Sequence, residues 1–248
     1  MNRLKRTKTV MLLASLCLLH FGISNANEDV KLDFEISFAS KINQAFQQSI
    51  IQKVESAQAE MIQIISVRVS ANNDDAEEEE NGNMYMSSSD LELVNDGGDN
   101  QTVGMRFRDL EIPQGASILS AYLVFNCDES SSGTTNLTIH GQDTDDAPIF
   151  SSSNNNITNR TKTSANVSWS NIAPWTINND YQSPDIAPVI QEIVDRWGWD
   201  CGNDMAIIIT GSGKRVAESY EGSPSEAALL VVEICGASCS SGGGQPSV

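Results

Sequence analysis

The chain has 248 residues, of which 40% are hydrophobic and only 6% are aromatic, and its formal net charge is −18. This length allows one globular domain with short extensions. A strongly negative protein repels nucleic acid and anionic membrane surfaces, so the composition excludes nucleic-acid binding as a function. It favours a soluble protein that attracts divalent cations.

Residues 1–26 have the three parts of a secretory signal peptide. Arg3–Lys8 is basic, Val10–Ile23 is apolar, and small residues precede a cleavage point ahead of Asn27. The apolar run is short for a membrane span. Cleavage removes four of the 15 basic residues and none of the 33 acidic ones, which leaves a net charge of −22. We therefore predict a secreted or cell-surface protein with no membrane span after cleavage, and an uncleaved anchor is the alternative.

Residues 27–62 are predicted to form a helical extension. Within Phe38–Ile62 the apolar residues recur at helical spacing, with polar residues between them. They are Ile42, Phe46, Ile50, Val54 and Ala57. Such an amphipathic helix covers the edge of a sheet or pairs with another chain. The second alternative makes residues 38–62 an element for self-association.

Residues 63–235 are predicted to form a two-layer β-sandwich. Met105–Arg108 alternates apolar and cationic residues, Pro113–Ala116 forms a turn, and Ile118–Phe125 is apolar on both faces, as in a central strand. The fold class is therefore all-β, of the jelly-roll type. Further strands are predicted at Ile65–Ser70, Met84–Val94, Thr134–His140, Met205–Thr210, Arg215–Tyr220 and Ala227–Ile234.

One crossover helix interrupts the strands at Pro184–Trp197. Ser183 can cap it, and its apolar stripe ends at Trp197, which the spacing places in the core. The stripe leaves Trp199 undecided between core and surface. Residues 236–248 are rich in Gly and Ser and are predicted to be a disordered tail.

Four cysteines remain after signal cleavage, and they allow three pairings. Export permits disulfides, and we predict Cys127–Cys201 and Cys235–Cys239. Zinc is the rival interpretation, but the spacings do not fit and His140 is the only histidine left.

Two acidic segments are candidate calcium sites. They are Asn72–Asn83 and Gln142–Ala147. Such a run is usually a solvated loop, although carboxylate oxygens also suit Ca²⁺. Calcium is therefore a predicted cofactor, with Asp74, Asp75, Glu77, Glu78, Asp143 and Asp145 as candidate ligands.

Two motifs occur in order. The first is Ile112–Ala116 followed by Ile118 and Ser120–Phe125, and the second is Pro184–Ile186 leading into Val189–Trp197, then Gly202-Asn203 and Met205–Ile209. Together they resemble the extracellular DNRLRE-type jelly-roll domains of bacterial surface proteins, whose relatives include carbohydrate-binding modules. Asp74–Glu78 also resembles the start of a recurrent bacterial surface-protein domain. The resemblance covers about residues 65–234. It implies non-catalytic polysaccharide binding or display at a cell surface.

The first functional hypothesis is a secreted, non-catalytic module that binds a polysaccharide or mediates adhesion to an extracellular matrix. Sugar binding by a β-sandwich uses exposed aromatic platforms and a hydrogen-bonding rim. The candidate platforms are Trp169, Trp175, Tyr181, Trp199 and Tyr220, and the candidate polar or anion-binding groups are Arg106, Arg108 and Arg215.

Two alternatives belong to other classes. A structural surface-layer or filament subunit would use the N-terminal helix and the tail for assembly. A polysaccharide-degrading enzyme would need a carboxylate pair, since the lone His140 argues against a Ser-His-Asp arrangement. Carboxylates are available at Asp143, Asp145, Asp146, Glu192 and Glu218, but no spacing singles out a pair.

Overall fold

The computed structural model describes residues 28–59, 62–236 and 239, and the chain divides into two units after Glu60. The predicted signal peptide and most of the predicted tail lie outside the described residues. The first unit holds one helix, α2 (Glu28–Ala59), where the helical extension is predicted. None of the described helices combines the length and the apolar character needed to cross a membrane.

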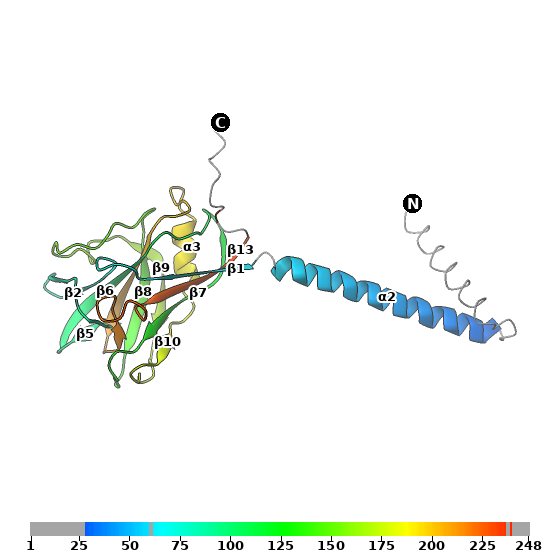
Figure 1. The fold of residues 1–248 in the computed structure, drawn as a ribbon, viewed down its shortest axis with the longest axis horizontal. Coiled ribbons are helices and arrows are strands. Elements are labelled where there is room, and N and C mark those ends of the chain that lie inside the picture. Colours follow the sequence, from blue (N-terminus) through cyan, green and yellow to red (C-terminus); the bar gives the residue numbers. More distant parts are fainter. Residues whose placement is uncertain (1–27, 60–61, 237–238, 240–248) are drawn as a thin grey trace, which may run out of the picture. The chain divides into compact units, whose positions relative to one another are not determined.

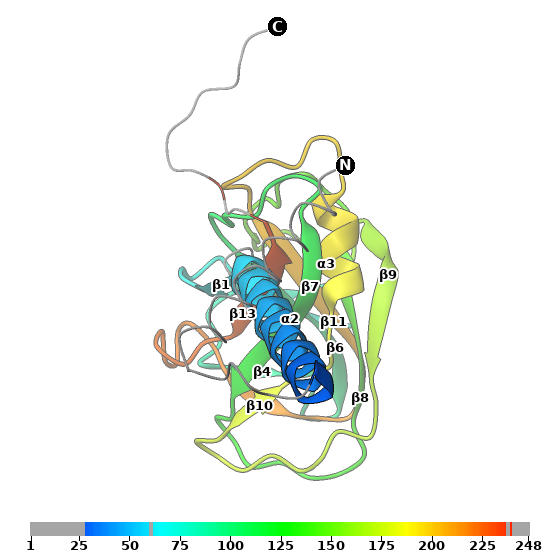
Figure 2. The same ribbon diagram turned by 90° about the vertical axis from the view of Figure 1, so that its right-hand side faces the viewer.

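The second unit is an antiparallel β-sandwich, which confirms the predicted fold class (Figure 1 and Figure 2). The smaller sheet has four strands, and the central strand predicted at Ile118–Phe125 lies inside it. Its order is β1 (Ile62–Arg68), β13 (Leu229–Cys235), β7 (Ser117–Asn126) and β10 (Asp180–Gln182).

The larger sheet has seven strands. Its order is β3 (Met84–Tyr85), β2 (Asp75–Glu79), β6 (Asp99–Phe107), β11 (Met205–Ser212), β8 (Asn136–Gln142) and β9 (Lys162–Trp169), with β5 (Asn95–Asp96) paired to β6. A separate ribbon pairs β4 (Asp90–Glu92) with β12 (Val216–Glu218).

The main core lies between the two sheets. Alternate residues of β6 point into it, namely Val103, Met105 and Phe107, and all three are fully buried. The helix α3 (Ala187–Val194) packs against β7, β8 and β9. It comes so close to β8 that a Cβ on Gly141 would lie 2.5 Å from Cδ1 of Ile193. The helix is shorter than the predicted span Pro184–Trp197.

The acidic segment after Asn72 is not the solvated loop that its composition suggests, because most of it forms a buried strand. Residues Asp75–Glu79 form strand β2 in the larger sheet, and the side chains of Asp75, Glu77 and Glu78 are buried. Strand β2 pairs with β6 over its whole length, so its backbone is hydrogen-bonded like that of any inner strand. Each buried carboxylate also finds a partner from a distant segment, which makes burial of this charge tolerable.

A second, smaller core lies on the outer face of the larger sheet. Ala76, Gly104 and Ile208 are directly opposite one another on β2, β6 and β11. Phe150 and Ile157 come from the loop that follows β8 and pack on them. A Cβ on Gly104 would lie 2.6 Å from Cζ of Phe150, so only glycine leaves room for this ring. The loop of residues 147–160 is thereby fixed to the sheet.

The predicted disulfides are wrong. Cys201 pairs with Cys239, while Cys127 and Cys235 are free thiols. Cys127 is fully buried at the end of β7, and its thiol donates to the carbonyl oxygen of Glu129. Cys201 instead lies exposed in the turn before β11, where the chain after β13 reaches it. Spacing along the chain does not reveal which ends of the strands lie together.

Candidate functional site

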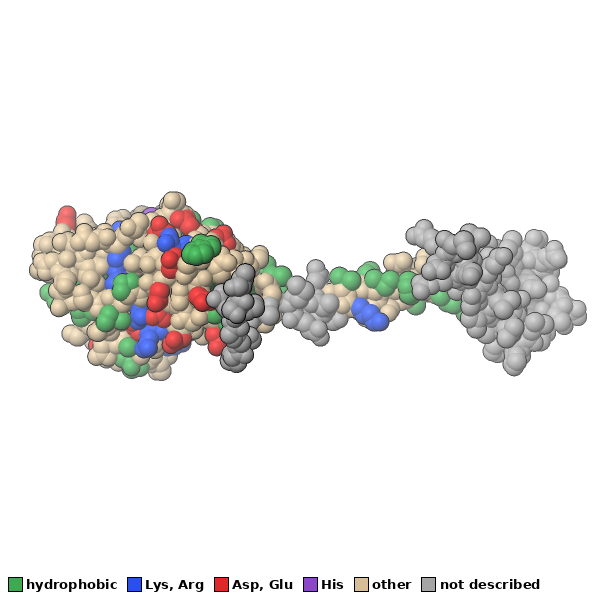
Figure 3. All heavy atoms as spheres, turned by 90° about the horizontal axis from the view of Figure 1, so that it is seen from above, with side chains coloured by type: hydrophobic (Ala, Val, Ile, Leu, Met, Phe, Trp, Pro, Cys, Tyr) green, Lys and Arg blue, Asp and Glu red, His purple; other side chains and the backbone are tan. Residues whose placement is uncertain are grey.

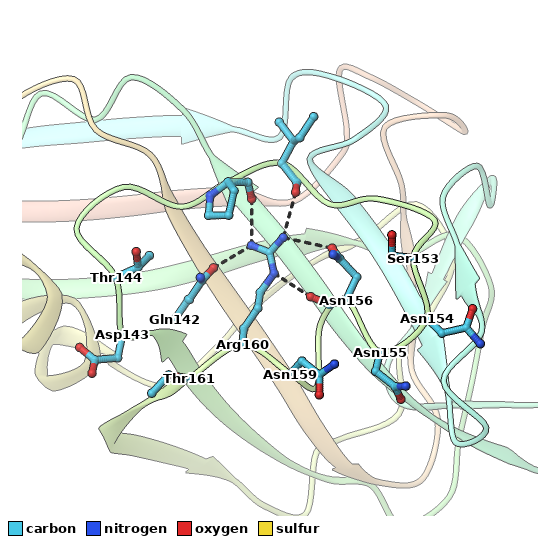
Figure 4. A pocket seen from close by; sticks show the side chains of 12 residues that line it. Gln142, Asp143, Thr144, Ser153, Asn154, Asn155, Asn156, Asn159, Arg160 and Thr161 are labelled. Carbon is cyan, nitrogen blue, oxygen red and sulfur yellow. Dashed lines mark hydrogen bonds between the residues drawn. The ribbon is translucent and has the colours of Figure 1, made fainter.

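A depression of about 600 Å³ lies where β8 ends (Figure 4). We call it the polar trough. Residues of two neighbouring segments line it, and most carry an amide or a hydroxyl. They are Gln142, Asp143, Thr144, Pro148, Ile149, Ser153, Asn154, Asn155, Asn156, Asn159, Arg160 and Thr161.

Arg160 holds the two segments of the polar trough together. Its guanidinium donates to Oε1 of Gln142, to Oδ1 of Asn156 and to the carbonyl oxygens of Pro148, Ile149 and Asn156 (Figure 4). It also stacks on Phe150, with Cζ 4.2 Å from the ring centroid. Burial, and secondarily the charge of Arg106, lowers the pKa of Arg160 to about 10, so it stays a cation at neutral pH. Its donors are occupied by the protein, which makes it a brace.

Glu78 on β2 also fixes the loop of residues 147–160 to the sheet. One of its carboxylate oxygens accepts hydrogen bonds from the backbone N–H groups of Ile157 (2.7 Å) and Thr158 (2.9 Å), and the other accepts from the Thr158 hydroxyl. By contrast, none of the hydrogen bonds among the described residues uses the side-chain amides of Asn154 and Asn159, which are exposed. The polar trough therefore has a fixed backbone and free donors and acceptors along its rim.

A second depression of about 370 Å³ continues past Ile149, which is exposed and lines both depressions. Arg106 and Arg108 line it as well. Arg106 is buried in ion pairs with Asp74 and Asp204, and its Nε donates to the carbonyl oxygen of Ala147. Arg108 is exposed and makes no ion pair with any described residue. Of the two predicted cationic groups here, only Arg108 is free for a ligand.

The structure brings three predicted platforms together. Trp169, Trp175 and Tyr181 cluster with Phe125, with ring centroids between 4.7 and 6.1 Å apart. Trp175 is only 2% exposed, and the Tyr181 hydroxyl accepts a hydrogen bond from the backbone N–H of Thr176. These rings pack on one another, so they extend the main core and leave little ring surface for a sugar.

Three further residues predicted to bind a ligand pack against the interior of the protein instead. The indole N–H of buried Trp199 donates to the carbonyl oxygen of Ile112 (2.8 Å). Tyr220 is half-buried against the core. Arg215 is fully buried, and its guanidinium donates to the Thr135 hydroxyl and to backbone carbonyl oxygens of residues 133, 172, 173 and 214.

Trp197 corrects the prediction of a core residue, because its side chain is 97% exposed. The helix ends at Val194, so the helical spacing no longer applies three residues later. The turn that follows directs Trp199 inward instead. Helical spacing extended past the true end of the helix thus selects the wrong tryptophan as the core residue.

The predicted calcium ligands do not converge on one site. Successive residues of β2 point to opposite faces of the sheet. Asp74 pairs with Arg106, Glu78 binds the loop of residues 147–160, and Asp143 and Asp145 both pair with Arg196. Among the described residues, the three carboxylates whose ligand atoms all lie within 4.8 Å of one another are those of Asp90, Asp128 and Glu129. No motif marks them, since they come from β4 and from the segment after β7.

Several buried carboxyl groups lie against other carboxyl groups. Burial, and then neighbouring Glu221 and Asp74, raises the pKa of Asp75 to about 7 even though the Tyr220 N–H lowers it. Burial and a hydrogen bond with Glu92 raise the pKa of Glu77 to about 9. These groups are protonated over part of the neutral range.

Burial and the neighbouring Asp128 likewise raise the pKa of Glu218 to about 7. The two side chains hydrogen-bond each other, which is closer than the roughly 5–9 Å that separates the two carboxyl groups of a glycosidase. Glu192 accepts the backbone N–H groups of Ser164 and Ala165. The carboxylates suggested for catalysis thus have structural partners.

No protein-family model matches the chain, and no curated protein sequence is significantly similar to it. Among solved structures, it is similar to a carbohydrate-binding module specific for non-crystalline cellulose (CBM28), with 12% identity, 59% of this chain and 73% of that chain covered, and a TM-score of 0.29. A family 35 carbohydrate-binding module from Clostridium thermocellum gives 9% identity, 68% and 97% coverage, and a TM-score of 0.27. The Eiger TNF of S. frugiperda gives 11% identity, 73% and 98% coverage, and a TM-score of 0.25. Scores this low do not assign a family.

Proposed function

We propose that this protein is a secreted, non-catalytic module that binds a polysaccharide through the polar trough. The observation that carries the proposal is the combination of a braced backbone with free side-chain amides on its rim. Its volume of about 600 Å³ is within the range of ligand sites. Sugar hydroxyls are donors and acceptors at once, and so are amides.

Charge favours a neutral polysaccharide over an acidic one. The whole chain has a formal net charge of −18, so a polyanion meets a repulsive field. Within the polar trough, the guanidinium of Arg160 is hydrogen-bonded to the loop, and the carboxylate of Asp143 forms an ion pair with Arg196. Recognition there rests on hydrogen bonds to uncharged groups.

The test is retention of the protein on a panel of insoluble and gelled polysaccharides. We expect the double substitution Asn154→Ala with Asn159→Ala to weaken retention about tenfold or more, because each lost hydrogen bond contributes about 0.5–1.5 kcal/mol. Asn179→Ala is the matched control, an exposed amide in the turn before β10. Failure of the unmodified protein to bind any polysaccharide would remove the proposal.

The same assay, run in Ca²⁺ and in chelator, tests the predicted calcium requirement. Retention that is lost in chelator and restored by Ca²⁺ supports calcium as a cofactor. Retention that is equal in both buffers removes calcium from the proposal and leaves binding through the polar trough intact.

The exposed apolar side chains of α2 favour a second candidate, a structural subunit that associates with further copies of itself. Ile42, Phe46, Ile50, Ile51 and Val54 are all between 39% and 55% exposed, and hydrophobic side chains follow the described part of the helix (Figure 3). A helix that exposes this much apolar surface gains stability by packing with another. An adhesive subunit would combine both candidates.

We expect the protein to form oligomers whose size depends on concentration in analytical ultracentrifugation. The triple substitution Ile42→Ser, Phe46→Ser and Ile50→Ser should shift the distribution to monomers, because it removes the apolar surface of α2. Lys41→Ser, an exposed position of the same helix, is the control. A monomeric wild type over the whole concentration range would rule this candidate out.

A further inference from the structure

Trp197 is displayed on a fixed turn. It follows α3, and its side chain is the most exposed of the large hydrophobic side chains that the structure describes, at 97% against 67% for the next, Ile64. The backbone N–H of Arg196 donates to Ile193, and that of Trp199 donates to Arg196, each at 3.1 Å. Trp199 anchors the far side of the turn in the core. Hydrogen bonds thus fix the backbone on both sides of the exposed indole.

The turn also abuts the loop that borders the polar trough. Arg196 forms ion pairs with Asp143 and Asp145, and Asp143 lines the polar trough. A Cβ on Gly198 would lie 2.2 Å from Oδ2 of Asp145, so the backbone on the other side of Trp197 is pressed against the same loop. One short segment, residues 143–145, therefore connects Trp197 with the polar trough.

An indole ring supplies the apolar stacking surface that the polar trough lacks. The trough offers amides and hydroxyls but no aromatic side chain. A pyranose ring has one face rich in C–H groups, which stack on an aromatic ring, while its hydroxyls need hydrogen bonds. Isolated exposed hydrophobic residues are common on proteins, but a nearly fully exposed tryptophan on a braced turn beside a polar depression is suited to this pairing.

We propose that Trp197 is a stacking subsite for a further sugar ring of the chain bound in the polar trough. The inference rests on the proposed function and deepens it, because it makes the module selective for chain length. A short oligosaccharide occupies the polar trough alone, whereas a longer one also reaches Trp197.

The test measures affinity by titration calorimetry with cellobiose and cellohexaose, and with xylobiose and xylohexaose, as uncharged probes of two lengths. We expect Trp197→Ala to weaken binding of the hexasaccharide about tenfold, and to leave binding of the disaccharide unchanged. Trp197→Phe should retain most of the affinity, since it keeps a stacking face. Tyr85→Ala, which removes an exposed aromatic ring on β3, is the matched control.

Acrylamide quenching gives a second measurement that does not depend on a variant. The other three tryptophans are buried or half-buried, so quenching in the wild type reports mainly on Trp197. We expect cellohexaose or xylohexaose to protect it and the disaccharides not to do so.

The outcomes separate the two proposals. Equal hexasaccharide affinity in wild type and Trp197→Ala, or an equal loss for both chain lengths, overturns the stacking subsite. If Asn154→Ala with Asn159→Ala still weakens binding in that case, the proposed function stands. If the wild type binds neither these probes nor any polysaccharide of the panel, both proposals are overturned.

Discussion

Phe150→Ala is expected to lower the free energy of unfolding by about 3–5 kcal/mol and to abolish polysaccharide binding. Phe150 is fully buried in the small outer core, and it supports the guanidinium of Arg160. Its loss leaves a cavity beneath the loop of residues 147–160, so the polar trough loses its fixed backbone. Urea unfolding gives the stability, and retention on polysaccharide below the unfolding transition gives the binding.

Phe125→Ala separates these two effects. Phe125 is also fully buried, but it belongs to the main core and packs on Trp169 and Trp175. We expect a similar loss of stability with binding retained. Gly104→Val should reproduce the binding defect from the other side of the contact, because its side chain would occupy the place of the Phe150 ring. Wild-type binding by Phe150→Ala would show that the loop does not form the site.

Glu77→Gln is expected to stabilise the protein at pH 8 and to have little effect at pH 4. A carboxyl group whose pKa is higher in the folded state holds its proton better there, so its contribution is fully present below its ordinary pKa of 4.5 and is lost as the pH rises to about 9. At pH 8 the native state therefore carries a penalty at Glu77, of about 1–3 kcal/mol. Glutamine has no proton to lose, and its amide oxygen can still accept the N–H of Glu92 that Glu77 binds at 2.7 Å.

The surroundings of Glu77 add to this penalty. Glu92 and Asp90 add negative charge beside it from β4, while Nζ of Lys214 lies 3.8 Å from Oε1 of Glu92. Asp75 and Glu218, each with a pKa raised to about 7, act in the same direction between about pH 4 and pH 7. Thermal unfolding by circular dichroism at pH 4, 6 and 8 should therefore show the difference between Glu77→Gln and wild type growing with pH.

Glu79→Gln is the matched control on the same strand. It removes the same charge, but hydrogen bonds from Asn81 and Asn83 lower the pKa of Glu79. This group contributes stability above its ordinary pKa, so the variant should be slightly destabilised at pH 8. A Glu77→Gln effect of equal size at all three pH values would contradict the assignment of a raised pKa.

Part of the site follows from local sequence. Gln142–Ala147 is an acidic loop, and the segment after it is polar and rich in asparagine, so a polar surface there is expected. The sequence does not show that Phe150 and Ile157 would fix this segment to the sheet. Their partners, Ala76, Gly104 and Ile208, lie on three strands and are small or apolar without any motif.

The sequence by itself determined the fold class and the helical extension. Period-two alternation in Met105–Arg108, an apolar run on both faces of Ile118–Phe125 and helical spacing after Phe38 are local patterns, and each indicates its strand or helix without knowledge of distant partners. Only the tertiary structure decided that Asp75–Glu79 is a buried strand, that Cys201 pairs with Cys239, and which tryptophan faces solvent. The reason is physical: a buried carboxylate such as Glu78 is stabilised by Thr158, 80 residues away, and local composition carries no record of a partner at that distance.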